Sequence, residues 1–275
     1  MGVASINATF WNRLLTLFAY RVTRYRYFRL SGPGSGSIVY VTSKLCIKAS
    51  RFTTLAEANA MQFVSRNTSI PVPKIYCAFK HKAITYIVME RIDGTMANDG
   101  WGFRSPESKM RILEQLKSMI NQLRNIPPPD DIGVANVDGG PIFDERLPNK
   151  SIWGPFRTIN DFHRELRDGI EASQLDDTSA TGLRELCAFH DEPWPRPVFT
   201  HGDLSSFNIM VRGDEVVGII DWETAGWMPP YWEYASAWNA APMNEFWQDE
   251  VDKFVTPMPR ELEMEAIRRR WFAAI

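Results

Sequence analysis

The sequence predicts an α+β protein of two lobes, in which a β-rich first lobe is followed by a mostly helical second lobe. Two observations lead to this class. Between residues 22 and 89, short β-prone runs alternate with glycine and polar turns, which indicates an antiparallel sheet, and one main stretch there is helical. From residue 105 onward most of the periodic segments are helical instead. We expect an N-terminal helix within residues 1–21, the sheet lobe and its connector over 22–92, and the helical lobe over 93–275.

The composition is that of a globular protein. The chain has 275 residues, of which 44% are hydrophobic and 23% charged, and its formal net charge is −2. Basic residues gather at the start, because residues 1–56 contain eight Lys or Arg and no acid. The three cysteines, Cys46, Cys77 and Cys187, lie far apart in apolar surroundings and match no zinc spacing, which favours buried, reduced thiols. We therefore expect an intracellular protein that is cytoplasmic or, as the weaker alternative, mitochondrial.

An amphipathic helix is predicted over residues 9–22, where four bulky apolar residues recur at helical spacing: Trp11, Leu15, Phe18 and Val22. We favour packing of this apolar face against the first lobe. Because the segment bears arginines and no acid, a mitochondrial presequence and contact of residues 9–29 with a membrane are the alternatives. No apolar run is long enough to span a bilayer. From Val22 to Leu30, β-prone residues alternate with arginines, which predicts a strand.

The segment Ser31–Ser37 is a glycine-rich turn. Its backbone N–H groups could approach phosphates, since glycine removes the Cβ obstruction, although a flexible hairpin connection explains it equally well. It does not continue into G-K-[ST], so it is not a Walker A loop. Four strands are expected after it, at Ile38–Thr42, Leu45–Ala49, Lys74–Phe79 and Ala83–Met89.

Three places in the first lobe carry residues suited to binding a nucleotide. Lys48 stands late in an apolar strand, where it is either an edge charge that reaches solvent or a cation that grips phosphates. Glu57 lies in the first turn of a helix predicted over 54–65, where it suits the helix dipole or could hold Lys48 in place. After the last strand, Glu90 to Gly94 form a connector whose backbone groups, at Glu90 and Ile92, could hydrogen-bond to a purine edge.

The second lobe begins with a well-marked helix. Ser105 is a favourable N-cap followed by proline at the first helical position, and apolar periodicity continues to Asn125. Residues 127–158 form a long irregular segment that is too aromatic to be disordered, and long loops of this kind are often functional. Further helices are predicted at 159–168, 180–190, 231–241, 245–254 and 260–272.

The chemistry of the chain centres on residues 196–226. A short strand, Val198–Thr200, leads into His201-Gly202-Asp203, and Asn208 follows five residues after Asp203. Two β-rich runs around a polar turn then predict a hairpin that ends in Asp221. Such a hairpin would bring Asn208 and Asp221 together at its open end, near Asp203. An amide oxygen beside a carboxylate suits Mg²⁺, and a further carboxylate suits activation of a hydroxyl, so the pattern favours phosphoryl transfer. Unrelated polar residues that cap turns are the structural alternative.

With these motifs the chain resembles the aminoglycoside phosphotransferase family of the protein-kinase-like superfamily, and is similar to its members from filamentous fungi. The matching segments are PVPKIY (71–76), YIVMERIDG (86–94), HGDLSSFNIMV (201–211) and GIIDWETAGW (218–227). The resemblance covers residues 28–240 and implies a bilobal protein-kinase-like fold with nucleotide in the cleft. Ser205-Ser206-Phe207 stands where many relatives have His-Pro or Asn-Pro, and Pro33 in the glycine-rich turn lacks an N–H.

The resemblance also implies roles for individual residues. Asp203 matches the catalytic aspartate that orients and deprotonates the acceptor hydroxyl, while His201 braces the loop. Asn208 and Asp221 match the two magnesium ligands. The nucleotide is ATP, with GTP as an alternative, and the residues expected to bind it are Lys48, its helix partner Glu57, Glu90 and Ile92.

The predicted function is therefore ATP- and Mg²⁺-dependent transfer of the γ-phosphate to a hydroxyl of a small molecule, with no nucleic acid as partner. An inactive nucleotide-binding or interaction module is the alternative. A protein kinase is disfavoured, because HGD and D-W-E stand in place of HRD and D-F-G and no A-P-E follows. The acceptor is not identified. Four residues are candidates for the cleft, each with packing or surface exposure as the simpler interpretation: Trp153, Glu223, Trp227 and Tyr231.

Overall fold

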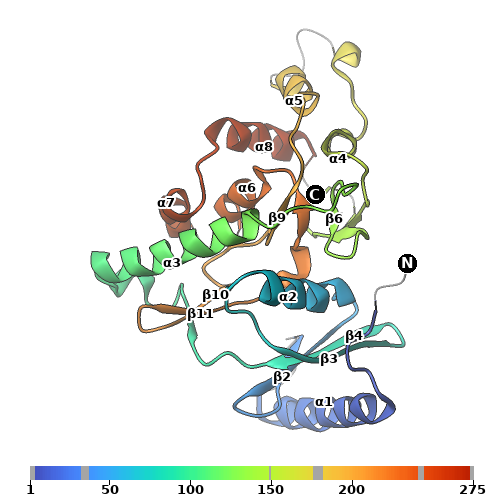
Figure 1. The fold of residues 1–275 in the computed structure, drawn as a ribbon, viewed down its shortest axis with the longest axis vertical. Coiled ribbons are helices and arrows are strands. Elements are labelled where there is room, and N and C mark those ends of the chain that lie inside the picture. Colours follow the sequence, from blue (N-terminus) through green and yellow to red (C-terminus); the bar gives the residue numbers. More distant parts are fainter. Residues whose placement is uncertain (1–3, 32–36, 149, 176–181, 241–244, 273–275) are drawn as a thin grey trace.

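The computed structural model describes residues 4–31, 37–148, 150–175, 182–240 and 245–272, with the side chains of 26–31 left out. A sheet-rich part built from the first third of the chain lies against a mostly helical part built from the rest (Figure 1). The predicted α+β class, with an antiparallel sheet first and helices after it, is confirmed. The Gly-rich segment 32–36 lies outside the described residues.

The first lobe is a four-stranded antiparallel sheet in the order β1-β2-β4-β3. Its strands are β1 (Ile38–Tyr40), β2 (Leu45–Ser50), β3 (Ile75–His81) and β4 (Ile84–Glu90). Because β2 lies between β1 and β4, Lys48 sits inside the sheet, opposite Ile38 and Ile87, and is 5% exposed. The interpretation of Lys48 as an edge charge that reaches solvent is therefore wrong.

Helices cover both faces of this sheet. Helix α2 (Leu55–Asn67) lies between the sheet and the second lobe, and helix α1 (Phe10–Ser31) lies on the outer face (Figure 1). Side chains of a strand alternate between the two faces. Accordingly Cys46, Ala78 and Ile87 join the core around α2, whereas Ile47, Phe79 and Tyr86 join a separate core with Tyr20 of α1.

Helix α1 differs in two ways from what the sequence predicted. It continues to Ser31, so the strand expected from Val22 to Leu30 is wrong. The helix packs on the sheet as predicted, but through Thr16, Leu17 and Tyr20 rather than through the expected apolar face, which is exposed. The ring of Tyr20 meets that of Tyr86 edge-on, with centroids 5.4 Å apart. Contacts of this kind outweigh the weak β preference of the segment, because β propensity depends on the surface available for packing.

The second lobe is built on α3 (Pro106–Arg124), which begins as predicted: the hydroxyl of Ser105 accepts the N–H of Ser108 at 3.2 Å. The other helices are α4 (Ile159–Leu166), α5 (Leu183–His190), α6 (Trp232–Trp238), α7 (Glu245–Phe254) and α8 (Pro259–Phe272), with 3₁₀ turns at η1 (Trp101–Phe103), η2 (Ala172–Gln174) and η3 (Trp222–Thr224). The strands are β5 (Thr95–Met96), β6 (Ala135–Asn136), β7 (Ile142–Phe143), β8 (Ile152–Trp153), β9 (Val198–Thr200), β10 (Ile209–Arg212), β11 (Glu215–Ile219) and β12 (Gly226–Met228).

The connector between the lobes is tied directly to the predicted hairpin. Strand β5 follows the connector and pairs with β10, so that Met96 lies opposite Met210. Gly94 packs against the same hairpin, since a Cβ added there would lie 2.9 Å from the carbonyl oxygen of Val211. The hairpin also reaches the first lobe, because the N–H of Ile219 donates to the carbonyl of Pro71 at 2.8 Å. The hairpin that holds the candidate site residues Asn208 and Asp221 thus contacts both lobes.

Two buried histidines in the second lobe predict how stability depends on pH. Nδ1 of His163 faces the carbonyl of His190 and Nε2 accepts the hydroxyl of Tyr231 at 2.9 Å. The ring also stacks on that of His190, with centroids 4.2 Å apart. Burial lowers the pKa of His163 to about 3 and also lowers that of His190. A folded-state pKa below the unfolded value of about 6.5 means that the unfolded chain binds more protons as the pH falls. The two neutral histidines therefore contribute fully to stability above about pH 6.5. Below this pH the free energy of unfolding falls by up to about 1.4 kcal/mol per pH unit for each histidine.

Urea unfolding at pH 7, 6 and 5 measures this slope. Replacement His163→Asn is expected to make the slope shallower, because one of the two groups no longer titrates. The matched control is His81→Asn, which removes an exposed histidine at the β3–β4 turn. An equal slope in the wild type and the His163→Asn variant would contradict the prediction.

Candidate active site

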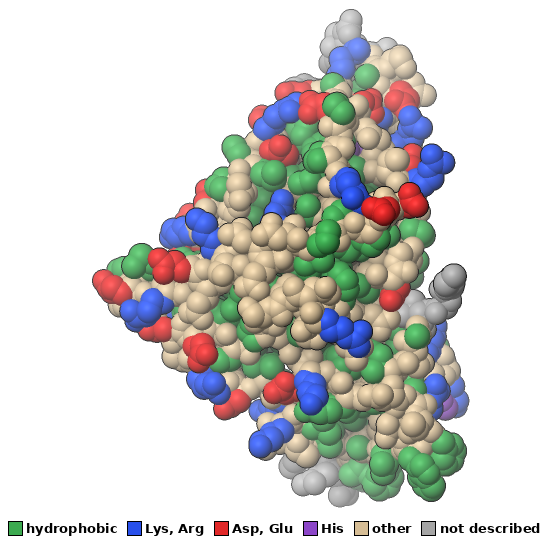
Figure 2. Space-filling view, viewed as in Figure 1, with side chains coloured by type: hydrophobic (Ala, Val, Ile, Leu, Met, Phe, Trp, Pro, Cys, Tyr) green, Lys and Arg blue, Asp and Glu red, His purple; other side chains and the backbone are tan. Residues whose placement is uncertain are grey.

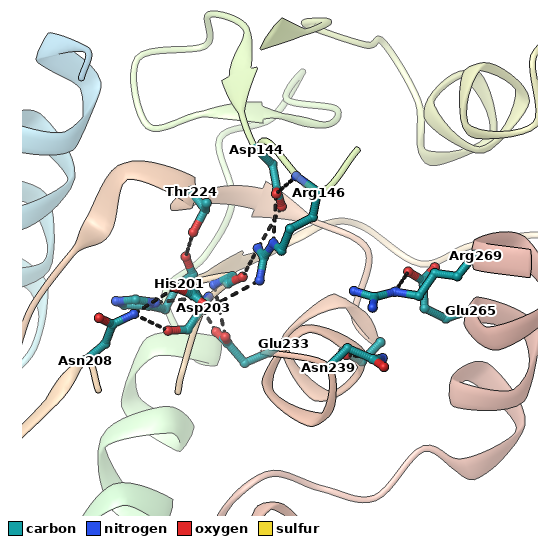
Figure 3. Close-up of polar contacts among 12 residues, drawn as sticks. Asp144, Arg146, His201, Asp203, Asn208, Thr224, Glu233, Asn239, Glu265 and Arg269 are labelled. Carbon is teal, nitrogen blue, oxygen red and sulfur yellow. Dashed lines mark hydrogen bonds and ion pairs between the residues drawn. The ribbon is translucent and has the colours of Figure 1, made fainter. Parts of the chain in front are cut away.

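The loop that carries Asp203 is fixed by three hydrogen bonds from two side chains. Strand β9 leads into it, and the buried carboxylate of Glu233 on α6 accepts the backbone N–H of His201 at 2.7 Å and that of Gly202 at 3.0 Å. The hydroxyl of Thr224 donates to the carbonyl of His201 at 2.9 Å. Figure 3 shows these groups around the loop. The loop is therefore held rigidly enough to present Asp203 in one orientation.

His201 braces this loop, as its predicted role requires. Its Nδ1 accepts the N–H of Asp203 at 3.1 Å, which assigns the proton to Nε2, and Nε2 lies 3.0 Å from the carbonyl of Ile220. Burial lowers the pKa of His201. The neutral ring therefore links the loop of Asp203 to the residue before Asp221.

Both carboxylate oxygens of Asp203 have partners. Oδ2 accepts the side-chain amide of Asn208 at 2.8 Å, and Oδ1 lies 3.2 Å from a guanidinium nitrogen of Arg146 (Figure 3). Burial raises the pKa of Asp203, while Arg146 and Asn208 act in the lowering direction. Arg146 also donates to the carbonyl of Gly202 and pairs with the buried Asp144 at 2.7 Å. The candidate base is thus oriented from two sides.

The hairpin brings Asn208 and Asp221 to its open end. Ile209 pairs with Ile219, and the N–H of Ile220 donates to the carbonyl of Asn208 at 2.9 Å. Asp221 follows with a φ of +64°, in the left-handed region that is uncommon for residues other than glycine. This backbone conformation ends β11 and directs the carboxylate of Asp221 toward Lys48, 2.7 Å away.

Lys48 lies among three carboxylates. Its ammonium is 2.9 Å from Glu57, 2.7 Å from Asp221 and 3.0 Å from Glu223. Burial disfavours the charged lysine, but the three acids outweigh burial and raise its pKa above the usual range. Burial raises the pKa of Glu57, with Lys48 acting against it. The pairing of Lys48 with Glu57 that the sequence suggested is present, and it reaches across to the second lobe.

The same cluster fits a divalent cation. One oxygen from each of Glu57, Asp221 and Glu223 lies within 4.8 Å of the other two. The donors are all oxygens, which suits Mg²⁺, and a single ammonium does not balance three carboxylates. Glu223 was expected only as a candidate for the acceptor cleft. Its position two residues after Asp221, in the D-W-E sequence, is the signal that places it here.

A pocket joins the predicted nucleotide residues to one of the predicted metal ligands. It lies between the first-lobe sheet and the hairpin, and its lining includes Lys48, Glu57, Glu90, Ile92 and Asp221. The N–H groups of Glu90 and of its neighbour Arg91 donate to Lys74 and Lys44 within the first lobe, which fixes the connector at the edge of this pocket. The structure thus brings together residues that lie up to 173 positions apart in the chain.

Three of the predicted residues lie outside the site, and two residues that contact its loop were not predicted. Trp153, Trp227 and Tyr231 are buried in the hydrophobic cores, so of the four candidates for the acceptor cleft only Glu223 faces the site. Arg146 was not predicted as a site residue. The one signal for it is that it belongs to the long irregular segment 127–158. Glu233 was also missed, because a glutamate inside a helix has no feature that distinguishes it from a surface charge.

Comparisons with known proteins identify the family and the fold of the chain. The model of the phosphotransferase enzyme family matches residues 37–264. A thermostable mutant of aminoglycoside phosphotransferase APH(4)-Ia, in a ternary complex with AMP-PNP and hygromycin B, is 17% identical, with a TM-score of 0.61 over 90% of this chain and 88% of that chain. Aminoglycoside-3'-phosphotransferase of type VIII is 17% identical, with a TM-score of 0.52 over 94% and 99%. APH(3'')-Id from Streptomyces rimosus, in complex with ADP and streptomycin, is 16% identical, with a TM-score of 0.50 over 90% and 97%.

At these identities the solved structures establish the fold alone. No curated protein sequence matches the chain. The family model, however, spans most of the length and includes the HGD loop, the hairpin and the D-W-E sequence. The likeness to members from filamentous fungi stays a prediction. The resemblance to the family itself is confirmed, and the chain belongs to the phosphotransferase enzyme family.

Proposed function

We propose that this protein transfers the γ-phosphate of ATP, in the presence of Mg²⁺, to a hydroxyl group of a small molecule. One observation carries the proposal: the ammonium of Lys48 lies 2.7 Å from Asp221, while Asn208, at the same end of the hairpin, holds Asp203 at 2.8 Å. A cation for phosphates, a carboxylate for metal and a candidate base therefore lie near the open end of the hairpin. Relatives solved with ADP and AMP-PNP support the choice of nucleotide.

In this proposal the purine lies against the connector, with the backbone of Glu90 and Ile92 at its edge, and the phosphates reach Lys48. GTP is the alternative nucleotide. Asn208 and Asp221, with Glu223 beside them, would hold Mg²⁺. When bound, the cation would offset the charge that develops on the phosphoryl oxygens.

The transfer step needs one base and one cation from the chain. The carboxylate of Asp203 accepts the proton of the acceptor hydroxyl as a bond forms between that oxygen and the γ-phosphorus. The bond from the γ-phosphorus to the bridging oxygen breaks, and ADP leaves with the electron pair. Lys48 stabilises negative charge on the phosphates throughout. Catalysis of this kind rests mainly on positioning and electrostatic stabilisation, which the hydrogen bonds around Asp203 supply.

The surroundings of Asp203 also suggest a class of acceptor. Relatives were solved with hygromycin B and streptomycin. In this chain the guanidinium of Arg146, itself paired with Asp144, lies 3.2 Å from the base. The two carboxylates balance or exceed this one cation in charge, but the guanidinium already occupies Oδ1 of Asp203, so an ammonium of the acceptor cannot pair with that oxygen. We therefore propose an acceptor whose reacting hydroxyl has neutral neighbours.

Release of ADP from Mg·ATP, measured with a panel of neutral polyols, sugar acids and aminoglycosides, tests this function. We expect turnover with at least one neutral acceptor and Mg²⁺-dependent thermal stabilisation by ATP. Stabilisation by Mg·ATP without transfer to any acceptor would instead favour the inactive nucleotide-binding module. Turnover with aminoglycosides alone would overturn the acceptor class and leave the phosphotransferase activity intact.

A variant of Arg146 tests its effect on the base. Replacement Arg146→Met removes a cation that lowers the pKa of Asp203, so the acid limb of the pH profile of kcat/KM is expected to move to higher pH. Arg146→Lys keeps the charge and should largely keep the profile. Arg157→Met, which changes an exposed arginine of the same segment, is the matched control. An unchanged acid limb in Arg146→Met would show that the guanidinium does not act on the base.

A further inference from the structure

Helix α1 carries a row of large apolar side chains that are exposed in the described part of the structure. Six of them have exposed fractions between 42% and 72%: Phe10, Trp11, Leu14, Leu15, Phe18 and Val22. Their spacings of one, three and four residues place them on one side of the helix, which we call the α1 apolar face. A contiguous apolar surface of this kind on a soluble protein indicates an interaction site.

The α1 apolar face points away from the protein. The opposite side of the helix, at Thr16, Leu17 and Tyr20, is the side that packs on the sheet. In Figure 1 the helix lies along the outer end of the first lobe, and in Figure 2 hydrophobic side chains gather at the lower right, over the start of α1. The helix is thus anchored by one side and offers the other to an external partner.

The charges around this face identify the chemistry of that partner. Helix α1 contains five arginines and no acid. A hollow beside the helix is lined by the apolar Leu14 and Phe18 and by basic residues of α1 and of the β3–β4 turn, among them Arg21, Arg24 and Lys82. A helix with bulky apolar residues on one side and basic residues at its borders complements a surface that is apolar within and anionic outside.

We propose that α1 is an interfacial helix that docks the enzyme on an anionic lipid bilayer. The apolar face enters the boundary between headgroups and acyl chains, and the basic border meets the anionic headgroups. Its 22 residues span about 33 Å, enough to lie along the surface. None of the helices in the described part of the chain has the apolar length that crossing a bilayer needs, so the contact is peripheral.

A second copy of the chain fits this face less well than lipid does. A symmetric contact through α1 would bring the arginines of both helices into one interface, and neither helix carries an acid that could pair with them. Lipid headgroups neutralise those charges instead. Docking through α1 would also leave α2 uncovered, since α2 lies on the other side of the sheet (Figure 1).

Flotation with vesicles of phosphatidylcholine, with and without phosphatidylserine, tests the proposal on the full chain. We expect binding to the anionic vesicles that weakens as salt is added. The double variant Leu15→Glu with Phe18→Glu should lower the partition coefficient by about tenfold or more, because two apolar side chains no longer enter the interface. Arg21→Gln combined with Lys82→Asn should lower it by about thirty-fold on anionic vesicles only. Asparagine suits the φ of +56° at position 82.

The control is Phe103→Glu, which adds the same charge at a residue that is 98% exposed in the second lobe, away from α1. It should bind vesicles as the wild type does. Unchanged thermal stability of the α1 variants shows that they fold. Absence of binding to anionic vesicles at low salt overturns the proposal, and so does equal binding to both vesicle types. A wild-type dimer that Leu15→Glu with Phe18→Glu converts to a monomer, without vesicle binding, assigns the face to a second copy instead.

Discussion

Replacement of Asp203 by asparagine is expected to lower kcat by about 10²- to 10⁴-fold, the contribution of a positioned general base. The amide has nearly the same shape and can still accept the side-chain N–H of Asn208, but it cannot take the proton of the acceptor. The KM for ATP should change little, because Asp203 binds neither Lys48 nor the connector in this structure. The loop itself should persist, since Glu233 and His201 hold its backbone.

Steady-state ADP release with an acceptor from the panel measures this loss. Thermal stabilisation by Mg·ATP should be the same in Asp203→Asn and in the wild type, which shows that the nucleotide site is intact. Asp249→Asn is the matched control, because it makes the same change at an exposed position of α7. If Asp203→Asn kept more than about a tenth of the wild-type kcat, the assignment of the base would be wrong.

The second large effect is expected at Lys48. Replacement Lys48→Met removes the cation that contacts the phosphates and should lower kcat/KM by about 10²- to 10³-fold, as loss of a preorganised electrostatic donor does. It also leaves the buried Glu57 without its partner at 2.9 Å. Breaking a buried ion pair from one side costs about 3–5 kcal/mol, so the variant should also be less stable in urea unfolding.

A double variant separates these two effects. Adding Glu57→Gln to Lys48→Met removes the unpaired buried carboxylate, so much of the lost stability should return. Activity should stay low, because the cation for the phosphates is still missing. Recovery of both stability and activity in the double variant would mean that Lys48 acts only as a structural partner of Glu57. The single variant Glu223→Gln is a further comparison, because it removes the charge of a less buried partner of the same ammonium.

The parts of the fold that depend on local sequence were predictable. The hairpin around residues 209–219 follows from two β-rich runs and a polar turn, and α7 has the predicted bounds, Glu245–Phe254. Arg146 and Glu233 were not predictable in the same way. Arg146 meets Asp203 across 57 positions, and Glu233 meets His201 across 32, through a loop path that no periodicity encodes. Contacts of this kind are fixed only when the lobe is assembled.

Helix α1 illustrates the other limit. Its apolar periodicity predicted the helix correctly, but periodicity alone does not say which side meets the protein. The face that was expected to pack, with Trp11, Leu15 and Phe18, is the larger apolar surface. The side that packs on the sheet is instead the one with Thr16 and Tyr20. The choice depends on the complementary rings of Phe79 and Tyr86, which lie more than fifty residues away in the chain.

The position of one ammonium among three carboxylates has a thermodynamic consequence. The proposed phosphate end of the cleft carries more acid than base, because three carboxylates, those of Glu57, Asp221 and Glu223, share the ammonium of Lys48. A polyphosphate without a cation meets repulsion there, whereas a divalent cation removes it. The two ligands should therefore bind cooperatively, and each must raise the affinity of the other by the same factor. The measured affinity for ATP is therefore expected to rise with the free magnesium concentration.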